Sequence, residues 1–419
     1  MHTRWSLRIA FAAVVVLVAG SCGGSSSGAA TRTVGVDYSH DEFSGIFIAF
    51  FPTKVTVRPG DTVHFKQAWN GEPHSVTLGT LVDKALGLVN PLLEKYPNGE
   101  GAPPGTEDQF DNAFKDLPFM FGDDDVVVQA AAQPCFLDSG DLPTDPAQPC
   151  PKRAQPAFNG RQAYYSSGFV PYAGNDGNTF NVKLADDIKP GTYGFYCNFH
   201  GPSMQGQIIV KPKGSKIPPA STVNRAGKSA ADKQAAPLLK AFHKATAGGF
   251  EIEKAAKAAG FEIPPEPTLS KIKGDYFAGF ASTRSQDLLM TEFLPKTITT
   301  KVGQKVTWVQ VGVHTVSFDV PRYFPLLIID KKGVVKLDPR ATDPVGGVGF
   351  PKTMPEGTEQ PFIVDGGSWD GTGFRSSGLT TETEGDEDIV GFSLTFTKAG
   401  KYPYACLIHP KMVGTVIVK

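Results

Sequence analysis

One loop sequence occurs twice in this 419-residue chain, and it constrains the fold more than any other feature. In each copy an aromatic-rich stretch that begins at glycine ends at a cysteine, a histidine follows after two residues, and a methionine precedes a glycine and a β-branched stretch. The first copy contains Cys197, His200 and Met204, and the second copy contains Cys406, His409 and Met412. The pattern predicts two strands in each half, joined by a tight loop that carries a thiol, an imidazole and a thioether.

These side chains are three of the four ligands of a blue copper site, which takes two histidines and a cysteine in one plane and a weak axial methionine. Each loop supplies one imidazole, so a second histidine must lie upstream. The segments that run from Pro52 to Gly60 and from Pro295 to Gly303 align without a gap, and each is followed by a histidine before an alternating stretch. The predicted ligand sets are His74, Cys197, His200 and Met204, and His314, Cys406, His409 and Met412.

Both ligand sets resemble those of the cupredoxin family, the small blue copper proteins, and the spacing of the second loop is similar to that of amicyanin. The first loop has one residue more between His200 and Met204. The resemblance implies a mainly β fold, with two Greek-key β-sandwich domains joined by a partly helical linker. It also implies two type 1 copper ions that cycle between Cu(II) and Cu(I). The backbone N–H groups of Ser75 and Thr315 are expected to donate hydrogen bonds to the cysteine sulfurs.

The function that this resemblance implies is single-electron transfer without an enzymatic activity, with redox proteins of the cell envelope as partners. A copper carrier or store could use the same ligands, although such proteins favour open, Met-rich sites and the chain has only six methionines. A copper oxidase or nitrite reductase would need further histidines, commonly as His-x-His pairs. The histidines left for that role, His40, His64 and His243, form no such pair. A purely structural repeat would not need these ligand types.

The first 21 residues have the features of a targeting signal. Arg4 and Arg8 precede an apolar run that is too short to cross a bilayer, and small residues lead to Cys22. This resembles a bacterial lipoprotein signal, in which Cys22 would be lipidated and residues 22–34 would form a flexible tether. Simple secretion with cleavage after Ser21 is the alternative. The expected location is therefore extracytoplasmic, either anchored by lipid to the outer face of the cytoplasmic membrane or free in the periplasm or medium.

Cysteine usage and charge agree with this location. Cys135 and Cys150 bracket a Pro- and Asp-rich loop that a disulfide would close in an oxidising compartment. The formal net charge of −1 gives no reason to expect a nucleic-acid partner. No apolar run after the signal has the length of a transmembrane helix.

We expect a first domain over 35–212, a Pro-rich and helical linker over 213–270, and a second domain over 271–419. An insertion over about 79–162 shows helical spacing of apolar residues. It could cap the metal site or dock a partner, but a surface excursion pinned by the disulfide is slightly preferred. A second insertion spans about 321–370. In the linker we expect two short helices, around Leu238 and around Ala256, and then a stiff Pro264–Pro267 segment. His64 alternates with Val63 and Phe65 and should face solvent.

Overall fold

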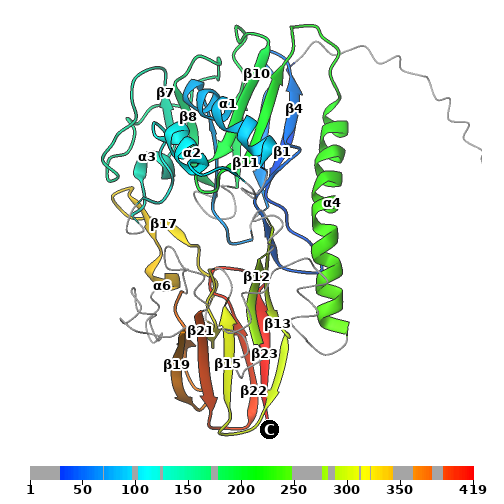
Figure 1. The fold of residues 1–419 in the computed structure, drawn as a ribbon, viewed down its shortest axis with the longest axis vertical. Helices are drawn as coiled ribbons and strands as arrows, with labels where there is room; N and C mark the ends of the chain where they lie inside the picture. Colours follow the sequence, from blue (N-terminus) through cyan, green and yellow to red (C-terminus); the bar gives the residue numbers. More distant parts are fainter. Residues whose placement is uncertain are drawn as a thin grey trace, which may run out of the picture.

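The computed structural model describes residues 29–68, 70–96, 102–122, 126–170, 178–247, 276–281, 288–310, 313–320, 322–342, 362–379 and 390–419. The protein is mainly β, as predicted, with its sheets gathered at the two ends of an elongated molecule (Figure 1). The signal, Cys22 and the Pro264–Pro267 segment lie outside the described residues. Within the described part, no helix has the length and apolar character needed to cross a membrane.

The first half of the chain forms two sheets that pack around one core. One sheet has the strand order β3-β1-β5-β9, and the other has the order β4-β11-β10-β6-β8-β7. Their bounds are Phe50–Phe51 (β3), Thr31–Val36 (β1), Thr62–Gln67 (β5), Thr179–Lys183 (β9), Lys54–Val57 (β4), Gly201–Val210 (β11), Gly191–Cys197 (β10), His74–Leu78 (β6), Tyr164–Val170 (β8) and Cys135–Leu137 (β7). Val34, Phe65, Phe195 and Ile208 from both sheets meet in this core, because alternate residues of a strand point to the same face.

The second half repeats this arrangement. One sheet has the order β19-β21-β15-β12-β13-β2, and the other has the order β14-β23-β22-β16-β20. Their bounds are Phe362–Trp369 (β19), Val390–Phe396 (β21), Lys305–Gln310 (β15), Tyr276–Ala281 (β12), Leu288–Leu294 (β13), Gly45–Phe47 (β2), Thr297–Thr300 (β14), Val413–Val418 (β23), Gly400–Ala405 (β22), Ser317–Phe318 (β16) and Arg375–Ser376 (β20). Trp308, Phe392, Tyr404 and Val416 fill its core.

The pairing of strands confirms the internal repeat. In both halves the strand after the repeated proline runs parallel to the last strand, as β4 beside β11 and β14 beside β23. In both halves that last strand is also antiparallel to the strand that ends near the cysteine, as β10 with β11 and β22 with β23. The predicted strand–loop–strand units are therefore present in both copies.

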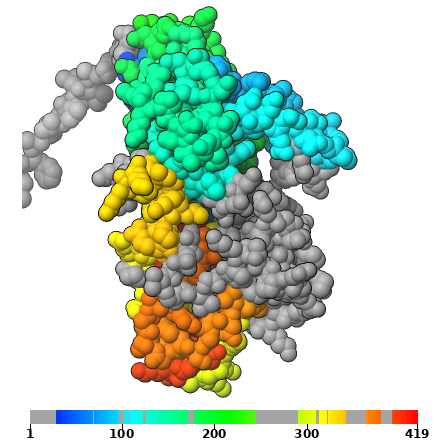
Figure 2. Space-filling model, turned by 90° about the vertical axis from the view of Figure 1, so that its left-hand side faces the viewer, coloured from blue at the N-terminus to red at the C-terminus, as the bar shows by residue number. Residues whose placement is uncertain are grey.

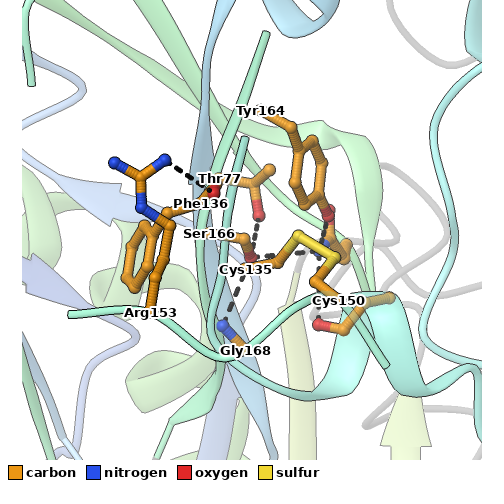
Figure 3. Close-up of a disulfide and its surroundings, with 10 residues drawn as sticks. Thr77, Cys135, Phe136, Cys150, Arg153, Tyr164, Ser166 and Gly168 are labelled. Carbon is orange, nitrogen blue, oxygen red and sulfur yellow. Dashed lines mark hydrogen bonds between the residues drawn. A yellow bond between two sulfur atoms is a disulfide. The ribbon is translucent and has the colours of Figure 1, made fainter. Parts of the chain in front are cut away.

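The first insertion holds three helices, α1 (Thr80–Lys95), α2 (Thr106–Phe114) and α3 (Gln129–Ala132). The helical spacing was predicted correctly, and Val82, Leu86 and Val89 are buried against β10 and Tyr196. Helix α1 contains Pro91 and continues through it. Cys135 and Cys150 form the predicted disulfide beside Tyr164 (Figure 3).

The second insertion contains the β17 (Leu327–Ile329) and β18 (Val335–Leu337) hairpin and the short helix α6 (Pro339–Thr342). Leu327 and Val335 of this hairpin pack with Met120, Ala131 and Phe169 of the first half. The yellow surface of this segment adjoins the teal surface of the first half in Figure 2. The two insertions therefore meet and connect the two halves.

Helix α4 (Ala220–Ala247) lies along both halves (Figure 1). Its buried residues recur every three or four positions and give the helix one apolar stripe: Val223, Gly227, Ala231, Ala235, Leu238 and Phe242. This stripe packs against β1, β3 and β13. The helix around Leu238 was predicted to be short, and this was wrong. It is 28 residues long, because its apolar stripe packs against strands of both halves. The helix expected around Ala256 lies outside the described residues.

Strand β2 joins the two halves directly, because it pairs antiparallel with β13 at the edge of a second-half sheet. Ser44, just before β2, donates its N–H to Glu292 at 2.8 Å and shares a hydroxyl contact with Thr291 at 2.7 Å. Near the N-terminus, β1 begins at Thr31, inside the stretch that was expected to be a tether over 22–34. The tether prediction is wrong for residues 31–34, because Val34 is buried between the sheets and β1 pairs with β5.

Candidate metal centres

Three of the predicted first-half ligands converge at one end of their sheet. His74 begins β6, Cys197 ends β10 and His200 lies in the loop that follows, so neighbouring strands deliver all three. The Nδ1 atoms of His74 and His200 lie 3.1 Å apart, and the Cys197 sulfur lies 3.6 Å from the Nδ1 of His200. The three donor atoms all fall within 4.8 Å of one another.

The second half brings together the equivalent residues. The Nδ1 atoms of His314 and His409 lie 3.0 Å apart, and the Cys406 sulfur lies 3.4 Å from the Nδ1 of His409. These donors also lie within 4.8 Å of one another and all three side chains are buried. Cys197 and Cys406 are both free thiols and form no disulfide with each other.

Both predicted axial methionines are fully buried. Met204 belongs to the same apolar cluster as Cys197, and Met412 belongs to the same cluster as Cys406. A buried thioether near a thiol suits a weak, soft ligand. The axial role of each methionine stays a prediction.

The residue after the first histidine supports the cysteine in both halves, as predicted. Ser75 N lies 3.3 Å from the Cys197 sulfur and Thr315 N lies 3.4 Å from the Cys406 sulfur, and each N–H donates. The hydroxyls of these two residues accept from the backbone N–H that follows each cysteine, Asn198 at 2.6 Å and Leu407 at 2.8 Å. Each ligand loop is thus tied to the histidine strand at two points.

Two carboxylates that sequence reasoning missed distinguish the first cluster. Asp37 Oδ2 lies 2.9 Å from His74 Nε2, and Glu72 Oε1 lies 3.2 Å from His200 Nε2. Burial alone would lower the pKa of His74, but hydrogen bonds to Asp37 and Cys197 raise it to about 10. Burial opposes ionisation of Cys197, yet hydrogen bonds to His200 and His74 hold the pKa of its thiol well below the usual value. The first cluster therefore favours a thiolate, the form that binds metal.

The second cluster has a different electrostatic environment. His409 Nε2 is buried and has no hydrogen-bond partner among the described residues. Burial, and then repulsion from His314, lowers the pKa of His409 well below its usual value. Burial raises the pKa of the Cys406 thiol. The two clusters thus share donors and differ behind the loop histidine, where His200 has Glu72 and His409 has no hydrogen-bond partner among the described residues.

Each insertion contacts the ligand loop of its own half. The preferred interpretation of the insertion over about 79–162, as a surface excursion pinned by the disulfide, is therefore wrong. Met120 donates its N–H to Asn198 O at 3.0 Å, and the Asn198 amide donates to Ala131 O at 3.4 Å. Phe324 donates its N–H to Leu407 O at 2.8 Å in the other half. Asn198 and Leu407 follow the two cysteines, so both insertions fix the loops that carry the ligands.

The other three histidines of the described residues lie outside the two clusters. His64 contacts Asn181 at 2.7 Å on the face opposite to buried Val63 and Phe65, as predicted. His243 Nε2 lies 2.8 Å from Glu42 Oε2 on the surface of α4. His40 stacks on Phe43.

The chemistry of the two donor sets fits a copper ion. Two imidazole nitrogens and one thiol sulfur face a common point in each half, and a buried thioether stands in the same core. Hard cations such as Mg²⁺ or Ca²⁺ prefer oxygen ligands, and neither set of converging donors includes one.

No protein-family model and no curated protein matches the chain. Parts of it are similar to solved structures of cupredoxins. A reduced Cu(I) form of an amicyanin mutant shares 21% identity over 30% of this chain and 70% of its own, with a TM-score of 0.14. A purple cupredoxin from Nitrosopumilus maritimus shares 20% identity over 31% and 83%, with a TM-score of 0.15. Reduced auracyanin from Roseiflexus castenholzii shares 16% identity over 44% and 99%, with a TM-score of 0.20. Such low scores place the chain in no family.

Proposed function

We propose that this protein is an electron-transfer protein with two type 1 copper centres, one in each half. The observation that carries the proposal is the presence of two equivalent clusters in which two histidine Nδ1 atoms and one cysteine sulfur converge. Copper, when bound, supplies a one-electron couple between Cu(II) and Cu(I). His74, Cys197, His200 and Met204 would hold one ion, and His314, Cys406, His409 and Met412 would hold the other.

The residues around the donors suit repeated one-electron transfer. The N–H groups of Ser75 and Thr315 hold the sulfurs in place, and the contacts of Asn198 and Leu407 fix the loops. A ligand set that cannot rearrange presents nearly the same geometry to both oxidation states, so little reorganisation opposes electron transfer. Burial of the sulfurs also excludes water from the thiolates.

We also propose that the protein works outside the cytoplasm with redox proteins of the cell envelope, anchored through a lipid on Cys22. The disulfide between Cys135 and Cys150 supports an oxidising compartment. The lipid anchor is proposed from the signal sequence alone. No activity as an enzyme and no nucleic-acid partner are proposed.

A copper carrier or store is the second candidate, because it could use the same donors. Burial favours electron transfer, since carriers exchange metal through accessible ligands. Cys197 is 0% exposed and Cys406 is 2% exposed. A site that is closed in this way releases metal slowly.

Copper binding can be tested one site at a time. The mature chain should bind two copper ions and show an intense thiolate charge-transfer band in visible light. Cys197→Ser and Cys406→Ser should each remove the band of one site and leave the band of the other. Rapid loss of copper from the intact chain to a chelator, without a thiolate band, would instead favour the carrier.

A further inference from the structure

We propose that the segment Asn70–Gly71–Glu72 connects the two candidate metal centres and carries an electron between them. The proposal rests on the function proposed above, because it requires a redox metal in both clusters. One centre loses one electron and the other centre accepts it. No proton is transferred, and no bond is made or broken in the segment.

Glu72 provides the contact with the first centre. Its Oε1 lies 3.2 Å from His200 Nε2, on the side of the ring opposite to the donor Nδ1. Asn70 provides a second contact, since its amide donates at 2.8 Å to Asp37 Oδ2, which itself lies 2.9 Å from His74 Nε2. Both histidines of the first cluster are therefore linked to this segment.

Gly71 provides the contact with the second centre. A Cβ added to Gly71 would lie 2.7 Å from His409 Cδ2 and would also collide with the carbonyl oxygen of Ile408. The backbone of Gly71 thus lies directly against the edge of the His409 ring. On that edge the adjacent Nε2 is buried and has no hydrogen-bond partner in the part of the chain that the structure describes. The close approach requires a residue without a side chain, and the φ of +117° at Gly71 favours glycine as well.

These contacts make the connection short. Gly71 and Glu72 are consecutive residues, so their Cα atoms are about 3.8 Å apart. One peptide unit and one side chain therefore separate the ring of His409 from the ring of His200. Electron tunnelling falls steeply with distance through the intervening atoms, so such a link gives much stronger coupling than a path through solvent.

The surroundings hold the segment in place. Asn70 is buried, and its amide also donates to Gly45 O at 2.8 Å. Gln67 donates to Glu72 O at 2.6 Å. On the other side Lys411, two residues after His409, donates to Ser39 Oγ at 2.8 Å and to His40 O at 3.1 Å. The ligand loop of the second cluster is thus joined to the first half next to the proposed connection.

The test is the rate of internal electron transfer in the full copper-loaded chain. A radiolytic pulse that supplies less than one electron per molecule reduces one site, and the absorbance of both thiolate bands then reports the redistribution. The bands are assigned with Cys197→Ser and Cys406→Ser. The proposal predicts a first-order redistribution whose rate does not depend on protein concentration.

Gly71→Ala should slow this redistribution several-fold, because the methyl group forces the segment away from His409. Gly79→Ala is the matched control. Gly79 has a φ of +125°, and an added Cβ there would lie 2.5 Å from the carbonyl oxygen of Ala163, with its nearest atoms in Ala163 and Tyr164 and none in a predicted ligand. If Gly71→Ala does not fold, Glu72→Ala, which removes the contact to His200, replaces it. Its control is Glu42→Ala, which removes a carboxylate from a surface histidine, His243.

The outcomes separate this inference from the function on which it rests. Equal rates in Gly71→Ala and Gly79→Ala, or in the replacement pair, would overturn the inference. Two loaded blue sites that equilibrate only at a rate proportional to protein concentration would overturn the inference alone. A chain that binds no copper at these cysteines would overturn the proposed function and the inference with it.

Discussion

At the scale of single residues, the two candidate centres have equivalent donors and different support behind them. Asp37 and Glu72 place negative charge behind the first pair of imidazoles, while His409 Nε2 has no partner among the described residues. A carboxylate behind an imidazole makes it a stronger donor, which favours Cu(II) over Cu(I). We therefore expect the first centre to have the lower reduction potential, so that an electron shared between the centres resides mainly in the second.

Asp37→Asn tests this asymmetry. Removing the charge should raise the reduction potential of the first centre and weaken its Cu(II) affinity by about 10-fold or more, with no change at the second centre. A redox titration followed at the two thiolate bands measures both. Asp61→Asn is the control, because Asp61 is an equally buried carboxylate that pairs with Arg32 and contacts neither candidate centre. Equal shifts in the two variants would show that Asp37 acts only through stability.

At the scale of elements, the sequence predicted the repeated units and missed what surrounds them. Alternating apolar residues and the Cys-x-x-His spacing predicted the strands, the loops and the convergence of three donors in each half. Asp37 and Glu72 could not be predicted, since neither belongs to the repeated ligand motif or to a periodic pattern. The contacts of the insertions depend on tertiary packing, and local spacing carries no information about it.

The disulfide should stabilise the first insertion. It closes a loop with a sequence separation of 15, for which chain entropy gives about 3 kcal/mol. The double substitution Cys135→Ser and Cys150→Ser should lower the free energy of unfolding by about this amount, as measured with a chemical denaturant. A change well below 1 kcal/mol would mean that the packing of Tyr164 and its neighbours holds this region without the bond.

The junction of β2 with β13 should make stability depend on pH. Burial raises the pKa of Glu292 above 4.5, although the N–H of Ser44 and Lys296 oppose the rise. The folded chain therefore binds this proton more tightly than the unfolded chain, and stability falls as pH rises from about 4.5 through the raised pKa. Glu292→Gln should lack this decrease when unfolding is compared across that range. Parallel pH profiles for the two proteins would contradict the assignment.

At the scale of the whole molecule, three of the connections that join the halves in the described residues are β2 on β13, helix α4, and the contact between the insertions. At the third connection Gln129 donates to Val335 O at 2.8 Å and accepts from Val335 N at 2.9 Å. Such buried connections predict that the halves unfold together in one cooperative transition.

Gln129→Ala should weaken this coupling. The substitution leaves the buried N–H and C=O of Val335 unpaired, which costs about 2 kcal/mol. Calorimetry should then show a broadened or divided transition. Gln162→Ala removes a glutamine that is equally buried and makes two hydrogen bonds within one half. It should lower stability and keep a single transition, so a divided transition in both variants would argue against a specific role of Gln129.

We propose that each half holds one type 1 copper ion. Electron paramagnetic resonance of the Cu(II)-loaded mature chain, with the copper counted on the same sample, tests it most directly. We predict two equivalents of bound copper. Both signals should have narrow hyperfine splitting, because thiolate coordination spreads the unpaired electron onto sulfur. Ordinary tetragonal Cu(II) signals with wide splitting, or a colourless protein without bound copper, would contradict it.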